Sequence, residues 1–210
     1  MMADKILIIL EGKTDFEIIK KLIIKNNISD ENKLEFFYNY GINDVYKYIE
    51  NLSTISSITQ NKINKLLIIV DCDDDEPNNR FLKITSLLKK QWKDLKKYNF
   101  SKIPVNPGIV NIEYKKIGIG IFLLPDNKNK GCLETLCLRS FRNNNILSCL
   151  DNYINCLNSK GENLNHNKIA KLKVKNYIYT INPDTYSATL DQQTDYLSSC
   201  FDDLKDFLKG

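Results

Sequence analysis

The stretch Lys65-Leu-Leu-Ile-Ile-Val70-Asp71-Cys72-Asp73-Asp74-Asp75 joins an apolar run directly to a cluster of acids. Such a run predicts a strand buried on both faces, as in a parallel sheet that is covered by helices. In sheets of this kind, ligands bind at the carboxyl ends of the strands. The stretch therefore predicts an α/β protein with a functional edge that carries Asp71 and Asp73.

Two other predicted strands also end in acids. The run 5–10 precedes Glu11, and the run 116–124 precedes Asp126, with Glu134 in the first turn of the following helix. Because the carboxyl ends of parallel strands meet at one edge, we expect these acids to converge. Clustered carboxylates repel one another and need a cation, and all-oxygen ligation suits Mg²⁺ or Mn²⁺.

The acids after the central run alternate along the chain. Asp71 and Asp73 are two residues apart, so an extended backbone places both carboxylates on one side. Cys72 would then point the other way into the packing, and Asp75 would continue the alternation if the chain stays extended. A solvated acidic turn that caps the next helix is the alternative here. A purely structural role near a helix start likewise stays open for the other acids.

Composition indicates one soluble domain. The chain has 210 residues and a formal net charge of +4, which permits nucleic-acid binding without arguing for it. The six cysteines form no Cys-x-x-Cys pair, and His166 is the only histidine, which argues against zinc. We expect reduced thiols in the cytoplasm, with no signal peptide and no membrane-spanning stretch.

The periodicity predicts the order β-α-β-α-β-α-β-α followed by a helical tail, which is typical of a parallel sheet of about four strands with right-handed crossovers. The expected strands are 5–10, 34–40, 65–70 and 116–124, with an edge strand or hairpin arm at 109–114 after a proline break at 104–107. The expected helices are 14–26, 43–58, 78–98, one from about 133, then 146–157, 169–181 and 194–208. Residues 14–17 form a capping-box pattern, and 143–145 form a polar loop. We assign 1–142 to an α/β core and 143–210 to a helical extension that packs on it.

Several segments carry a family resemblance. Glu11-Gly-Lys-Thr-Asp15 resembles the Toprim signature, and Val70-Asp-Cys-Asp-Asp-Asp75 resembles its DxD motif. The later Leu124-Pro-Asp-Asn127 and Gly131-Cys-Leu-Glu134 resemble a narrower group, the stand-alone Toprim proteins related to OLD-family nucleases, whose function is not established. The resemblance covers nearly the whole chain and includes Asn79-Arg-Phe81 and the helix around 166–171.

This resemblance implies a Toprim-like (Rossmann-like) fold and phosphodiester chemistry that depends on a divalent metal. Glu11 would be a metal ligand or general acid/base, Asp71 and Asp73 the DxD metal ligands, and Glu134 the additional OLD-type acid. The further candidates for the same metal cluster are Asp15, Asp75 and Asp126. No nucleophilic tyrosine matches a motif, so strand passage is not expected. Because the chain has no Gly-x-x-x-x-Gly-Lys-Ser/Thr loop, an ATPase or other regulator would be a separate partner.

Hydrolysis of a phosphodiester needs an activated water and charge stabilisation, which two metals about 4 Å apart or a single metal can supply. Glu11 can exchange a proton if neighbouring carboxylates raise its pKa. Lys171 is the first candidate for a cation beside the phosphate. The remaining candidates for nucleic-acid contact are Lys13, Lys128, Lys130, Lys168 and Lys175, each of which has a solvated surface charge as its alternative.

Three other classes of protein gather acids in this way. A phosphotransfer receiver domain expects paired acids after its first strand, and a haloacid-dehalogenase-type phosphatase expects Asp-x-Asp there, so both fit poorly. A non-catalytic metal- or nucleic-acid-binding module, or a regulatory partner, is the serious alternative to a nuclease, because one sequence does not separate a working site from an inactive one. The choice between DNA and RNA stays open, and a homodimer is one of the assemblies that the sequence allows.

Overall fold

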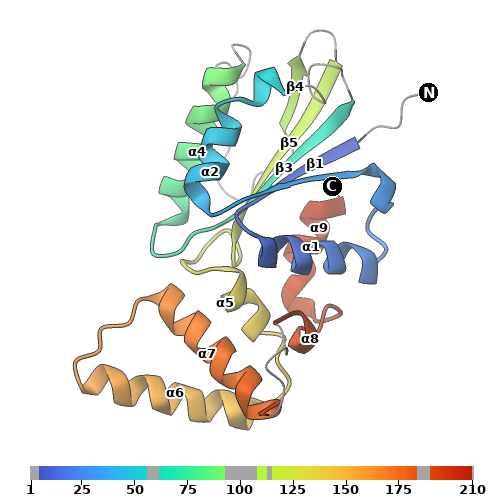
Figure 1. Cartoon of the computed structure of the whole chain (residues 1–210). Coiled ribbons are helices and arrows are strands. Elements are labelled where there is room, and N and C mark those ends of the chain that lie inside the picture. The colour runs from blue at the N-terminus through green and yellow to red at the C-terminus, as the bar shows by residue number, and fades with distance from the viewer. Residues whose placement is uncertain (1–4, 56–61, 93–107, 113–114, 184–189, 210) are drawn as a thin grey trace.

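The computed structural model describes residues 5–55, 62–92, 108–112, 115–183 and 190–209. In this part of the chain, five strands form one sheet in the order β2-β1-β3-β5-β4 (Figure 1). The four parallel strands are β1 (Lys5–Leu10), β2 (Leu34–Tyr38), β3 (Ile63–Asp71) and β5 (Lys115–Leu124). β4 (Gly108–Ile112) pairs with β5 in the antiparallel direction at the edge. The predicted α/β class with four parallel strands is confirmed.

Side chains of the central strands alternate between two buried faces, as a sheet covered on both sides requires. In β1, Leu7 and Ile9 pack in one core, whereas Ile8 and Leu10 pack in the other. β3 and β5 follow the same alternation. Each fully buried leucine or isoleucine contributes about 1.5–3 kcal/mol, so the apolar runs fix the sheet as the centre of the molecule.

Helices cover both faces of the sheet (Figure 1). α2 (Ile42–Ile49) and α4 (Pro77–Gln91) lie on one face, and α1 (Lys13–Lys25) and α9 (Asp202–Lys209) lie on the other. α9 comes very close to β5, because a Cβ atom on Gly120 would lie 2.7 Å from the ring of Phe207. The last helix of the chain is thus packed directly onto the central sheet.

The other helices gather at the carboxyl end of the strands (Figure 1). They are α5 (Leu133–Leu138), α6 (Asn144–Ser159), α7 (His166–Ile181) and α8 (Leu190–Gln193). α7 packs against α5 and α6, and its Val174 and Tyr177 belong to the same buried core as α1. Within the described residues, no helix is long and apolar enough to cross a membrane.

Several expected boundaries differ from the structure. α1 begins at Lys13 with Gly12 as its N-cap, so Thr14 is inside the helix and the expected capping box at 14–17 is wrong. Asn143 is not part of a loop but caps α6, because its side chain accepts a hydrogen bond from the backbone of Ile146 at 3.2 Å. The helix expected from 43 ends at Ile49 and is followed by a 3₁₀ turn, Leu52–Thr54.

The single helix expected at 194–208 is also wrong. Residues 194–198 are not helical, and they are followed by a 3₁₀ turn at Ser199–Phe201 and by α9, while the short helix α8 ends before this stretch. Between α8 and the 3₁₀ turn, the side chains of Asp195 and Ser198 accept hydrogen bonds from backbone N–H groups two residues further on. Such local bonds compete with helical ones and interrupt the helix. The expected ends of the helices at 56–58 and 93–98 and the proline break at 104–107 lie outside the described residues.

Candidate functional site

A cavity of about 510 Å³ opens at the carboxyl end of β1 and β3. It is lined by residues 11–15, by residues 38–41 at the carboxyl end of β2, and by Asp71, Glu134 and Lys171. The cavity is therefore formed by several elements, namely the strand ends, the start of α1, the start of α5, and α7. Sequence order spreads these segments over most of the chain, and the parallel topology brings them together.

Asp71 connects three of these segments. It is the last residue of β3, is 9 % exposed, and accepts a hydrogen bond from the backbone N–H of Leu133 at 2.9 Å. Its own N–H donates to the Glu11 carboxylate at 2.8 Å. Burial raises the pKa of Asp71 well above its ordinary value, and repulsion from Asp15, Glu11 and Glu134 acts in the same direction.

Glu11 and Asp15 are also perturbed. Burial raises the pKa of Glu11 to about 7, with further contributions from the charges of Asp73 and Asp15. Burial raises the pKa of Asp15 to about 6, and repulsion from Glu134 adds to it. Neighbouring carboxylates raise the pKa of Glu11, which is the condition for its exchange of a proton, but loss of solvent is the larger cause. Three carboxylic acids therefore share a poorly solvated space that favours a cation.

Asp73 does not continue the strand. Its φ of +53° is left-handed, and its backbone exchanges hydrogen bonds with Gly131, at 2.7 Å and 2.9 Å. A tight turn follows, in which the N–H of Asp75 donates to the carbonyl of Cys72 at 3.0 Å. The extended alternation expected through Asp75 is therefore wrong. Cys72 is fully buried in the core, which confirms its expected packing role.

Two side chains hold the carboxylate of Asp73. The side-chain amide of Asn167, at the start of α7, donates a hydrogen bond to it. Arg80 of α4 lies 3.8 Å from it and 3.5 Å from the carboxylate of Asp75. Arg80 is buried and also donates to the Tyr46 hydroxyl and the Cys72 carbonyl, at 3.0 Å and 3.1 Å. Burial raises the pKa of Asp73, while Arg80 and Lys171 oppose this shift.

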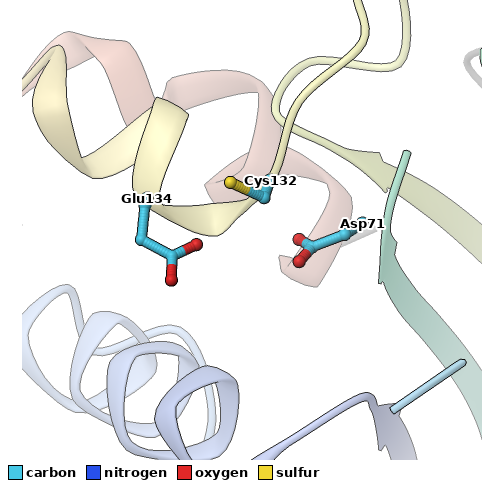
Figure 2. A group of neighbouring side chains, drawn as sticks. All are labelled: Asp71, Cys132 and Glu134. Carbon is cyan, nitrogen blue, oxygen red and sulfur yellow. The ribbon is translucent and has the colours of Figure 1, made fainter. Parts of the chain in front are cut away.

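Asp71, Cys132 and Glu134 form a group that could hold a metal ion. Their ligand atoms all lie within 4.8 Å of one another. In Figure 2, the two carboxylates point toward a shared space, and Cys132 lies at the start of α5. Burial raises the pKa of the Cys132 thiol, and the charges of Glu134 and Asp71 act in the same direction. The other two donors are carboxylate oxygens, which fit a hard cation.

Lys171 is the cation that α7 brings to the cavity. Partial burial disfavours its charge, but Glu134 and the other neighbouring acids outweigh this effect and raise its pKa. Asn167 and Lys171 are four residues apart on α7 and so lie on the same face of the helix. One face of α7 therefore supplies both an amide and an ammonium group to the acids of the core.

Other predicted residues lie away from the shared space or have other partners. The carboxylate of Asp126 accepts hydrogen bonds from the backbone N–H groups of Lys128 and Asn129 and pairs with Arg139 at 2.8 Å. Burial opposes its charge, yet the bonds from Asn129 and Arg139 keep its pKa below the ordinary value. Asp75 faces Arg80.

The predicted lysines are dispersed over the surface. Lys13 lies at the cavity and is 3.7 Å from Glu17 across one helical turn, and Lys130 pairs with Glu76 at 2.9 Å. Three further lysines are exposed on the loop after β5 and on α7, namely Lys128, Lys168 and Lys175. Only Lys13 and Lys171 among the predicted cations line the cavity itself.

Sequence reasoning assigned no role to several residues of the site. Arg80 was noted only as part of a motif, and Asn167 had no signal beyond its nearness to Lys171. Tyr38 and Tyr40 also line the cavity; Tyr38 is the last residue of β2, and Tyr40, which the sequence places in the same strand, lies beyond its end. An aromatic pair at the carboxyl end of a parallel strand, at the ligand-binding edge, is the pattern that could have indicated them.

Fold and site together define an α/β protein with an acidic cavity at the carboxyl end of a mostly parallel sheet. The chain matches a family model described as a protein of unknown function (DUF3226) over residues 5–210, and it belongs to this family. No curated protein and no solved structure matches the chain.

Proposed function

We propose that the protein is a Toprim-type nuclease that hydrolyses phosphodiester bonds of DNA or RNA with Mg²⁺ or Mn²⁺. The observation that carries this proposal is the meeting of Glu11, Asp15, Asp71 and Glu134 with Lys171 around one cavity. These residues come from four separate segments of the chain, and Asp73 is held nearby by Arg80 and Asn167. Acids and a lysine at the ligand-binding edge of a parallel sheet are suited to a metal ion and a phosphate.

The donor set supports the choice of cation. Asp71 and Glu134 offer carboxylate oxygens within 4.8 Å of one another, and burial raises the pKa of the neighbouring Cys132 thiol. Hard cations such as Mg²⁺ and Mn²⁺ prefer oxygen ligands, whereas zinc sites are typically built from thiolate and imidazole. Burial and, after it, mutual repulsion raise the pKa values of Glu11, Asp15 and Asp71, and a divalent cation would offset both effects.

Each residue then has a defined task. A bound metal would activate water and stabilise charge at the phosphate. Asp71, Glu134 and Asp15 hold the cation, with Asp73 as a further carboxylate whose orientation is fixed by Arg80 and Asn167. Glu11 has a pKa of about 7 and so exchanges a proton readily near neutral pH.

Positive side chains give the phosphate backbone its contacts. Lys171 binds the phosphate oxygens at the cavity, and Lys13 stands at its rim. Lys168 and Lys175 are exposed on the same helix as Lys171 and extend the surface that contacts the nucleic-acid backbone. Regulation by ATP would come from a separate ATPase partner.

A second candidate is a non-catalytic metal- or nucleic-acid-binding module. It is favoured by the hydrogen bonds that already occupy two of the acids: Asp71 accepts from Leu133, and Glu11 accepts from Asp71. Acids engaged in this way can serve to join loops rather than to perform chemistry. The same residues would then bind a metal or a partner without hydrolysis.

The test is cleavage of supercoiled plasmid, single-stranded DNA and structured RNA with Mn²⁺ and with Mg²⁺. The wild type is compared with Asp73→Asn and with the matched control Asp74→Asn, whose side chain is exposed beside it. We expect cleavage to fall by about 100-fold or more in Asp73→Asn and to remain within about twofold in Asp74→Asn. Equal cleavage by Asp73→Asn would exclude this site, and a folded, metal-binding wild type that cleaves none of the substrates would favour the module.

A further inference from the structure

Two tyrosines at the rim of the acidic cavity are exposed. Tyr40 is 97 % exposed and Tyr38 is 40 % exposed, and both line the cavity together with the acids. Burying an aromatic side chain is strongly favourable, so a tyrosine left almost wholly in solvent makes little contribution to the fold. The position of Tyr40 beside a candidate phosphate site gives it a different use.

The segment that carries the tyrosines is fixed to the acid-bearing loops. The N–H of Gly41 donates to the backbone carbonyl of Glu11 at 2.9 Å. The ring of Tyr38 stacks on Phe16, with centroids 4.6 Å apart and planes 16° apart, and Phe16 directly follows Asp15. Tyr40 is thus presented by a segment that is bound on both sides to residues of the site, which lowers the entropy cost of binding a ligand.

Other exposed tyrosines of the described chain do not share this setting. Tyr153 on α6 and Tyr179 on α7 are each 47 % exposed, and neither lines the cavity. Tyr40 therefore differs from them both in its exposure and in its neighbours. This contrast also provides a matched control for an experiment.

We propose that Tyr40, with Tyr38 beside it, is a stacking platform for an unpaired nucleobase whose phosphate enters the acidic cavity. The proposal rests on the proposed function and specifies its substrate class. Aromatic rings bind single-stranded nucleic acid by stacking on the bases, without strong sequence preference. A base inside a continuous duplex is already stacked on both faces, so the platform selects single strands or frayed ends.

The same chemistry could come from a free nucleotide, which also joins a base to a phosphate. The measurement is therefore the binding, by fluorescence anisotropy in Ca²⁺, of a labelled single strand, with a duplex, a strand of abasic residues and a nucleoside 5′-monophosphate as competitors. Competition by the monophosphate at the concentration at which the strand competes assigns the platform to free nucleotides. Competition only by the strand assigns it to nucleic acid.

The variants are Tyr40→Ala, Tyr40→Phe and the control Tyr153→Ala, each checked for unchanged thermal unfolding. We expect Tyr40→Ala to weaken binding of the strand by at least about fivefold, whereas Tyr40→Phe keeps the ring and stays within about twofold. Tyr153→Ala should bind as the wild type does, and the abasic strand and the duplex should compete poorly.

Cleavage in Mn²⁺ by the same proteins separates the two proposals. Binding by Tyr40→Ala equal to that of the wild type, or equal competition by the abasic strand, overturns the platform even if the wild type cleaves. A wild type that binds the strand through Tyr40 and never cleaves it supports the platform and overturns the nuclease. A wild type that binds neither strand nor nucleotide overturns the platform.

Discussion

Two effects act in opposite directions on the pKa of the Glu11 carboxyl group. Its carboxylate accepts the N–H of Asp71 at 2.8 Å, which favours the charged form, while burial raises its pKa to about 7. Asp15 and Asp71 are shifted in the same direction. At the scale of single residues, these carboxyl groups therefore keep protons to a higher pH than usual, and a bound metal ion would displace those protons.

The raised pKa of Glu11 predicts how the stability of the metal-free protein, kept in a chelator, depends on pH. The pKa of Glu11 is about 7 in the folded chain against an ordinary value of 4.5, so the folded state alone holds this proton between those values. Stability should thus fall as pH rises from about 5 to about 7.5, by an amount on the order of 1–3 kcal/mol. Urea unfolding of the wild type and Glu11→Gln measures this, and the variant should show a flatter profile.

Glu162 is exposed, so Glu162→Gln is the control, and its stability should change with pH as that of the wild type does. Stability that is constant or rising over this pH range would contradict the raised pKa values.

Arg80 predicts a cost in stability. Its buried side chain donates to the Tyr46 hydroxyl and the Cys72 carbonyl and faces two carboxylates. Arg80→Met should destabilise the fold by about 2–3 kcal/mol, mostly through the lost hydrogen bonds, since Asp73 and Asp75 are partly solvated. Arg142→Met removes an exposed ion pair with Asp195 and should leave the stability of the fold almost unchanged. Equal midpoints of urea unfolding for the two variants would refute the structural role of Arg80.

At the scale of elements, the loops after β3 and β5 are joined by the paired backbones of Asp73 and Gly131. Gly131 has a φ of +140°, and a Cβ atom there would lie 2.9 Å from the Thr135 hydroxyl. Gly161 also has a positive φ, +94°, but a Cβ atom there meets nothing within 4 Å. Both glycines have a positive φ, which disfavours other residues, and they differ in the space around them.

This pair predicts a difference between two matched variants. Gly131→Ala should lose about 1–3 kcal/mol more than Gly161→Ala, because it adds a steric contact to a similar backbone strain. Gly131→Ala should also weaken Mn²⁺ binding, since it displaces Asp73, whereas Gly161→Ala should not. Thermal unfolding and metal titration of both proteins test this, and equal losses would show that the space near Thr135 has no effect.

Sequence patterns predicted elements well where the pattern reflects burial. β1 matches its predicted bounds, and β3 and β5 differ by one or two residues, because apolar runs covered on both faces have few other solutions. The acids Glu11, Asp71 and Glu134 were placed together by the same logic. The turn at Asp73 and the approach of Asn167 could not be predicted, because both depend on contacts between segments that are far apart in the sequence.

At the scale of the whole molecule, metal binding should stabilise the fold. A cation bound only by the folded chain, at about 100 times its Kd, adds about 2.7 kcal/mol. For a chain of this size, that corresponds to a rise in Tm of about 5–11 °C. Glu134→Gln should reduce the rise caused by Mn²⁺, whereas Asp126→Asn should retain it, because Asp126 is engaged by its own loop and Arg139. Differential scanning calorimetry measures both, and an unchanged Tm in the wild type would argue against a metal site.

The contribution of α7 has a consequence for biosynthesis. All the acids of the cavity are translated by residue 134, but Asn167 and Lys171 follow later and must fold back onto them. At roughly 5–20 residues per second, a ribosome needs a few seconds to cover that interval. During this time the acids of the cavity lack the ammonium group of Lys171, although Lys13 has already been translated. An interrupted polypeptide that stops before α7 would therefore lack Lys171 and Asn167, so that the proposed nuclease becomes competent only late in its own synthesis.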